Sequence, residues 1–175
     1  MTSKFVRAAA LLFPGLLAGA FQYGAVNVLY AFRAVPLDVR FTFHTALMRV
    51  NGPVMQTLMA LSILSTLIFA ARTRSRHRLI AGIACALEVI TFIITRFGNV
   101  PINQKIKVWA VSGPPSDYAA VLHRWELFHF ARTGTAILAF VLLVTILAGF
   151  ITNTAEPLPD DRPTANHEPA CATQI

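Results

Sequence analysis

The stretch TGTAILAFVLLVTILAGFI at residues 133–151 contains no charged residue and decides the fold class. Its length is close to the ~20 residues that an α-helix needs to cross ~30 Å of hydrocarbon. Three further apolar segments of similar length lie at residues 8–32, 54–71 and 79–95. The sequence therefore predicts an all-α integral membrane protein, with a four-helix transmembrane domain over residues 1–152.

The composition agrees with a membrane protein and excludes a soluble domain. Apolar residues make up 55% of the 175 residues and charged residues only 13%, against about 25% in globular proteins. The formal net charge is +7, but the basic residues lie in or beside apolar segments rather than in a solvated stripe with interleaved aromatics. We therefore expect the partner of this charge to be the lipid bilayer and not nucleic acid.

The densest short basic segment is Arg72-Thr73-Arg74-Ser75-Arg76-His77-Arg78, between the second and third apolar segments. The positive-inside rule places such a loop in the cytoplasm. Four crossings then place both termini in the cytoplasm and leave outer loops at residues 33–53 and 96–132. The polar tail at 153–175 is predicted to be disordered, with no catalytic role. Gly15 and Gly19 form a GxxxG motif, which allows close helix packing within the bundle or in a homodimer.

Both outer loops are predicted to contain amphipathic interfacial helices. Apolar residues recur at helical spacing over residues 39–50, and Asn51-Gly52-Pro53 is predicted to end that helix. In the second loop, Asn99 followed by Pro101 predicts the start of a short helix through Trp109. No helix breaker follows Ser116, so a fourth helix is predicted over residues 117–151, about 50 Å long at 1.5 Å per residue.

The part of this fourth helix that exceeds the hydrocarbon thickness carries a polar cluster. Its members are His123, Arg124, Trp125, Glu126, His129 and Arg132. His123, Glu126 and His129 follow one another at 60° around the helix and share one broad face.

Three interpretations of the cluster are open. The first is anchoring at the membrane interface, where Trp109 and Trp125 lie at headgroup depth and the arginines snorkel. The second is an iron or copper site made by His123, Glu126 and His129, with His44 from the first outer loop. The third is acid-base catalysis, with an imidazole beside a carboxylate and guanidinium groups that hold an anion.

Glu88 lies in the middle of the third apolar segment. A charge there is costly unless the carboxyl is paired or protonated, so Glu88 indicates a polar bundle interior. Gln22, Asn27 or Gln56 would satisfy it structurally. A proton-relay or substrate-facing role is the alternative.

Three features in chain order carry a resemblance to a known family. They are the four membrane helices, the phrase Asn99-Val100-Pro101-Ile102-Asn103 after the third, and Arg124-Trp125 with His129 and Arg132 leading into the fourth. Over residues 12–150 the chain resembles the anthrone oxygenase family. The resemblance implies a small membrane monooxygenase that converts a polyketide-derived anthrone into an anthraquinone with O2, beside polyketide biosynthesis.

The resemblance also implies roles for the outer-loop residues. An anthrone methylene that loses one proton becomes a phenolate-like anion, which O2 oxidises without a flavin. His129 is then the expected base, oriented by Glu126 or His123, and Arg132 and Arg124 stabilise the oxyanion. The expected substrate-binding residues hydrogen-bond, stack on or face a flat polycycle that enters sideways from the lipid: Asn99, Asn103, Trp109, Trp125, His44 and Glu88.

A non-enzymatic membrane protein is the main alternative to an oxygenase. In a scaffold, assembly partner or small-molecule carrier, the same polar residues would only satisfy the bundle interior. Proton abstraction needs no metal, so no cofactor is predicted by the oxygenase interpretation.

Overall fold

The computed structural model describes residues 3–152, and this range contains helices and no strand. Four helical runs are long and apolar enough to cross a membrane: Lys4–Arg33, Leu37–Arg72, Ser75–Ser112 and Tyr118–Gly149. The predicted all-α four-helix bundle is confirmed, and the chain is a multi-pass membrane protein. The predicted disorder of the tail at 153–175 lies outside the described residues.

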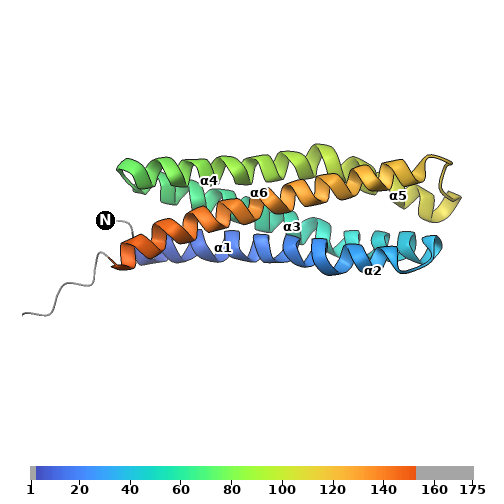
Figure 1. Ribbon diagram of the computed structural model, residues 1–175, viewed down its shortest axis with the longest axis horizontal. Helices are drawn as coiled ribbons and strands as arrows, with labels where there is room; N and C mark the ends of the chain where they lie inside the picture. The colour runs from blue at the N-terminus through green and yellow to red at the C-terminus, as the bar shows by residue number, and fades with distance from the viewer. Residues whose placement is uncertain (1–2, 153–175) are drawn as a thin grey trace, which may run out of the picture.

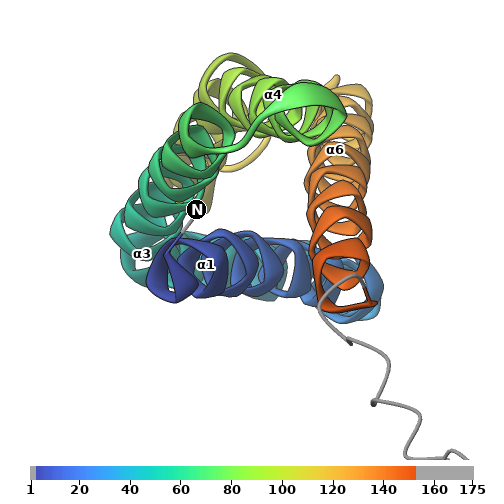
Figure 2. The same cartoon turned by 90° about the vertical axis from the view of Figure 1, so that its left-hand side faces the viewer.

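Four long helices surround a common axis. They are α1 (Lys4–Tyr23), α3 (Leu37–Arg72), α4 (Ser75–Ile93) and α6 (Tyr118–Thr152). In the end view of Figure 2 they form the four sides of a square, in the order α1, α3, α4, α6. Figure 1 shows that the start of α1, the link from α3 to α4 and the end of α6 lie at the same end of the bundle. The arginine-rich link and both ends of the described chain therefore share one side of the membrane.

Two of the runs contain a widened π-helical segment. The first run continues from α1 through η1 (Gly24–Val28) into α2 (Leu29–Arg33). The third continues from α4 through η2 (Ile94–Asn99) into α5 (Val100–Ser112), which ends at Gly113 with φ 81°. Pro101 lacks an N–H, and its ring clashes with the carbonyl four residues earlier, which accounts for the wider turn just before it. The short helix predicted in the second outer loop is thus joined to the third membrane helix.

The predicted helix end at Asn51-Gly52-Pro53 is wrong, because α3 runs without interruption through these residues. Proline inside a helix costs about 3 kcal/mol. Packing outweighs this cost here, since Phe41 before the proline and Met59 after it are both buried against other helices. The helix predicted in the first outer loop is therefore the first half of α3.

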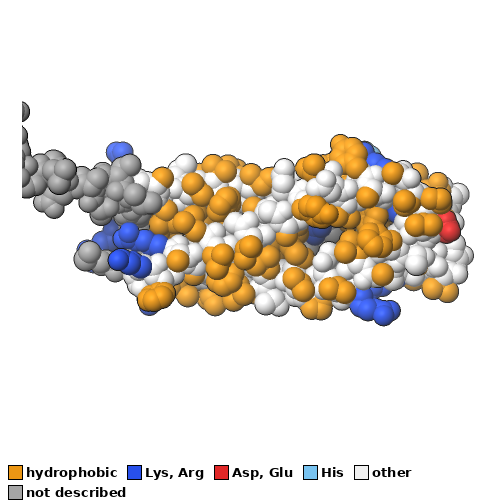
Figure 3. Space-filling model, turned by 90° about the horizontal axis from the view of Figure 1, so that it is seen from below, with side chains coloured by type: hydrophobic (Ala, Val, Ile, Leu, Met, Phe, Trp, Pro, Cys, Tyr) orange, Lys and Arg blue, Asp and Glu red, His pale blue; other side chains and the backbone are white. Residues whose placement is uncertain are grey.

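The outer surface of the bundle is largely apolar. In the view of Figure 3, hydrophobic side chains spread over the length of the bundle, and basic side chains gather at the end from which the grey tail leaves. Leu64, Leu138 and Val144 are among the large apolar residues exposed on this surface. Gly15 of the GxxxG motif faces inward, because an added Cβ would lie 3.0 Å from the Phe140 ring, whereas Gly19 faces open space. This close approach belongs to the bundle itself.

Candidate functional site

A cavity of about 320 Å³ lies inside the bundle where α1 passes into η1. This volume is at the lower end of the ~300–1,000 Å³ range of small-molecule sites. The α1–η1–α2 run and α3 supply most of its lining, and η2, α5 and α6 supply Thr95, Val100, Asn103, Trp125, His129 and Arg132. The cavity therefore joins apolar walls to a small polar group.

The cavity lies near one boundary of the hydrocarbon layer, at the end of the bundle away from the arginine-rich link between α3 and α4, which we call the outer end. At 1.5 Å per residue, the axial rise from Lys4 to Gly24 in the first run is about 30 Å. The rise from Thr152 back to Arg132 along α6 is also about 30 Å. Both values match the ~30 Å thickness of the hydrocarbon core.

Arg132 and His129 form the polar pair at the cavity wall. Arg132 donates from Nη2 to His129 Nδ1 at 2.7 Å and from Nε to the same atom at 3.1 Å. The two residues lie three positions apart on α6, so their side chains are neighbours on one helix face. The Trp125 ring lies parallel to the imidazole, with centroids 5.2 Å apart, and fixes its plane.

Arg132 is a cation without an acidic partner among residues 3–152. Its other contacts are a long hydrogen bond of 3.5 Å to Thr95 Oγ1 and a position over the Phe21 ring, 4.5 Å from the centroid. The two ion pairs in this range both use Glu126, with Arg33 and Arg40. The Arg132 side chain is half-buried, and a cation removed from water is costly unless it is paired. The cavity is therefore suited to an anionic or strongly polarised ligand atom.

The hydrogen bonds from Arg132 set the tautomer of His129. Arginine only donates, so His129 Nδ1 must accept, and the neutral ring carries its proton on Nε2. Adding a second proton at Nδ1 would place two positive charges within 2.7 Å of each other. Nε2 is buried beside Gly24, where an added Cβ would lie 3.1 Å away. This arrangement favours a donor role for His129 over the base role expected from the sequence.

A second network passes through Asn103. Trp125 Nε1 is only a donor and lies 2.7 Å from Asn103 Oδ1, which fixes the orientation of the amide. The same oxygen lies 3.0 Å from His44 Nε2, so His44 must donate from Nε2. His44 Nδ1 is then an acceptor, and it is buried without a partner in the described part of the chain. Both histidines therefore carry their proton on Nε2, but the nitrogen without a partner in the described residues is the Nε2–H donor in His129 and the Nδ1 acceptor in His44.

His44 lies directly behind the cavity wall. Its ring stacks on Phe32 with centroids 5.0 Å apart, and it meets Trp125 edge-on at the same distance. Phe32 and Trp125 both line the cavity, whereas His44 does not. His44 is 1% exposed, so its free nitrogen has no access to bulk water.

Glu126 belongs to a separate ion-pair cluster at the outer end of the bundle. Its carboxylate pairs with Arg33 at Oε2 and with Arg40 at Oε1, the second at 3.3 Å. The Arg40 side chain is 9% exposed and that of Arg33 is 46% exposed. Glu126 therefore ties α6 to α2 and α3 and does not contact His129.

Four other predicted site residues lie away from the cavity. His123 and Arg124 are exposed on α6, with Arg124 over the Phe128 ring. Asn99 is buried and donates from Nδ2 to the Trp125 carbonyl oxygen at 3.0 Å, so it joins η2 to α6. Trp109 packs in an apolar cluster near Phe41. These residues support the bundle or face outward.

Glu88 lies deeper in the membrane, between α3 and α4. It is 1% exposed, and its Oε1 accepts a hydrogen bond from Thr66 at 3.0 Å. Its partner thus comes from α3, although not from the residues expected. Within residues 3–152, no three His, Cys, Asp or Glu side chains cluster in a way that could hold a metal ion. The proposed set of His123, Glu126 and His129 is divided among the outer surface, the ion-pair cluster and the cavity.

Several cavity residues were not predicted. Met48, Met55 and Met59 of α3 line one wall, and Gly24 and Thr95 lie beside His129 and Arg132. With Gly52, the methionines repeat at helical spacings of four, three and four residues, a signal hidden by the predicted break at Pro53. Methionine gives a deformable wall that packs well against aromatic rings.

Comparison with known proteins gives one family match. The family model described as anthrone oxygenase matches residues 40–142, which include His44, Asn103, Trp125, His129 and Arg132. No curated protein and no solved structure shows a significant match to the chain.

Proposed function

Because the chain belongs to the anthrone oxygenase family, we propose that it oxidises an anthrone-type aromatic with O2 to the corresponding quinone, as a step of polyketide-derived metabolism. The observation that carries the proposal is the guanidinium of Arg132, which has no acidic partner among residues 3–152, at the wall of a largely apolar cavity. A substrate that becomes an anion on losing a proton would supply the missing negative charge. Interactions that strengthen as charge develops are those that accelerate a reaction.

The reaction balances without a further reductant. One anthrone and one O2 give one anthraquinone and one water: the methylene loses two hydrogens, its carbon gains one oxygen atom, and the second oxygen atom leaves as water. The first step removes one methylene proton and moves the electron pair onto the ketone oxygen. The protein's task is to hold that oxygen and accept that proton.

The nitrogens that the two histidines leave without a partner in the described residues suggest how the tasks are divided. Arg132 and the Nε2–H of His129 are donors, and we assign them to the developing oxyanion. The proton goes to an imidazole with a free lone pair, and His44 Nδ1 is such an atom. His44 lies behind Phe32 and Trp125, so the transfer passes through a water molecule or follows a movement of these rings.

The test uses purified full-length protein in liposomes with anthrone. Oxygen uptake and anthraquinone absorbance are followed together and should agree one to one. Arg132→Ala should lower turnover by about 10²- to 10³-fold, the usual cost of losing an oxyanion donor. Arg96→Ala removes an exposed arginine from η2 and serves as the matched control, with turnover unchanged.

Two outcomes would overturn the proposal. Wild-type turnover in Arg132→Ala would show that the unpaired cation is not used. Binding of anthrone without any oxygen uptake by the wild-type protein would favour a small-molecule carrier instead.

A further inference from the structure

The cavity is closed on most sides. Towards the outer end, it is covered by a buried apolar cluster that includes Phe41, Trp109 and Trp125, and by the ion pairs of Glu126. Towards the inner end, Leu17, Phe21 and Met59 pack together across α1 and α3. A ligand in water therefore meets packed side chains in both directions along the bundle axis.

The exposed residues of the lining lie on two helices. On α1 they are Ala20 and Tyr23, and on α3 the exposed residue is Gln56, next to the half-buried Gly52 and Met55. The lining residues from η2, α5 and α6 are buried or half-buried. The cavity thus opens sideways between α1 and α3, and this opening faces the apolar outer surface of the bundle.

We propose that a flat, amphiphilic aromatic ligand enters this cavity laterally from the outer leaflet, through the gap bounded by Ala20 and Tyr23 on α1 and by Gly52 and Gln56 on α3. The apolar residues of the lining let the ring system of the ligand pass from the lipid hydrocarbon into the cavity. Tyr23 and Gln56 at the rim of the gap offer hydrogen bonds to the polar edge of the ligand. The identity of the ligand as an anthrone-type molecule rests on the proposed function. The opening itself does not.

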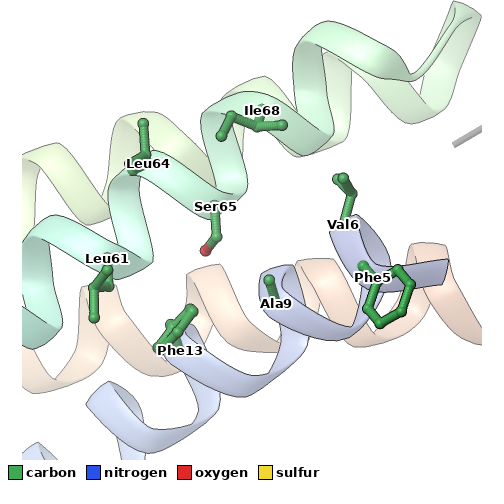
Figure 4. Close-up of a pocket in the computed structure, with 8 residues that line it drawn as sticks. All are labelled: Phe5, Val6, Ala9, Phe13, Leu61, Leu64, Ser65 and Ile68. Atoms are coloured by element: carbon green, nitrogen blue, oxygen red, sulfur yellow. The ribbon is translucent and has the colours of Figure 1, made fainter. Parts of the chain in front are cut away.

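A second hollow on the same helix pair shows why the polar groups matter. It has a volume of about 280 Å³ and lies between Phe5, Val6, Ala9 and Phe13 of α1 and Leu61, Leu64, Ser65 and Ile68 of α3 (Figure 4). Its one polar side chain, Ser65, already donates to the Ser62 carbonyl oxygen at 3.0 Å. This inner groove offers no free polar donor, whereas the outer cavity ends at Arg132, which has no acidic partner among residues 3–152, and so favours a ligand with a polar edge over an acyl chain.

The gap is tested first without any substrate. In Trp109→Phe the remaining tryptophan is Trp125, which lines the cavity and is 4% exposed. Liposomes of lipids brominated on their acyl chains should quench Trp125, because a chain can enter the gap. Ala20→Phe and Gly52→Phe should reduce this quenching. Gly19→Phe places the same ring one residue away on open surface and should not.

The route is tested with anthraquinone as the probe in ordinary liposomes. The rate at which it quenches Trp125 should follow its mole fraction in the bilayer when lipid is added at constant total probe. Ala20→Phe and Gly52→Phe should slow this rate on the order of tenfold or more, and Gly19→Phe should leave it unchanged.

Rates that follow the aqueous probe concentration, or that are the same in both blocked variants and wild type, would overturn lateral entry. Ala20→Phe and Gly52→Phe could reduce quenching by brominated lipid as expected while anthraquinone fails to bind to the wild-type protein. That result would overturn the proposal that the ligand is aromatic, and it would count against the proposed function. The same result would leave the opening in place.

Discussion

Gly24 in η1 offers a graded test of the position of His129. A Cβ added at Gly24 would lie 3.1 Å from both Cε1 and Nε2 of His129, whereas ordinary contacts begin at 3.4 Å. Gly24→Ala should therefore push the imidazole by about 0.3 Å or more, away from η1. The backbone at Gly24 has ordinary helical angles, φ −58° and ψ −41°, so alanine itself is not strained there.

The expected loss of turnover follows from this displacement. A misplacement of 1 Å can cost about 10²-fold in rate, so 0.3 Å corresponds to about fourfold, and we expect a loss of about four- to tenfold. Stability should fall by about 0–2 kcal/mol, because alanine gains about 1 kcal/mol of helix propensity over glycine while the tight contact costs about 1–3 kcal/mol.

Turnover of anthrone and the ¹⁵N chemical shifts of the imidazoles are the two measurements. The chain has five histidines, so the signals of His129 can be assigned from a His129→Ala variant. The shift of Nδ1 should change in Gly24→Ala as its bond to Arg132 is altered. Gly19→Ala, where no atom lies within 4 Å of the added Cβ, is the matched control and should change neither quantity.

Unchanged turnover and unchanged His129 shifts in Gly24→Ala would refute the reasoning, since the imidazole would not then be held against η1. Altered His129 shifts with unchanged turnover would support the packing of His129 against Gly24 but would show that His129 takes no part in the reaction.

Three further predictions concern the ion pairs, the deep carboxyl and the topology. Glu126→Ala should lower stability by about 3–5 kcal/mol in thermal or denaturant unfolding, because Arg40 is left buried without its partner; a change below 1 kcal/mol would contradict this. Glu88→Gln should keep both the melting temperature and turnover, because an amide can still accept from Thr66; lost turnover in a stable variant would give the carboxyl a proton-relay role. Tags at both termini should be accessible only from the cytoplasm, as the loop at 72–78 predicts, and external labelling of either tag in intact cells would reverse the orientation.

The fold class followed from hydropathy because crossing a membrane depends on a local property of each segment. Every backbone polar group of such a segment in hydrocarbon must be hydrogen-bonded within its own helix, so a long apolar segment in a membrane folds as an α-helix. This is why the four helices, and the start of α6 close to residue 117, could be predicted. The break at Pro53 could not be judged locally, since buried residues on either side of it hold α3 together.

The sequence by itself determined that His129 and Arg132 are neighbours, because residues three apart on a helix always are. It also placed His123 and Glu126 on a shared face of α6. Only the tertiary structure decided which helices pack against that face: α2 and α3 bring Arg33 and Arg40 to Glu126, whereas η1 brings Gly24 to His129. The partner of a polar side chain depends on contacts between segments far apart in the chain, which no local pattern encodes.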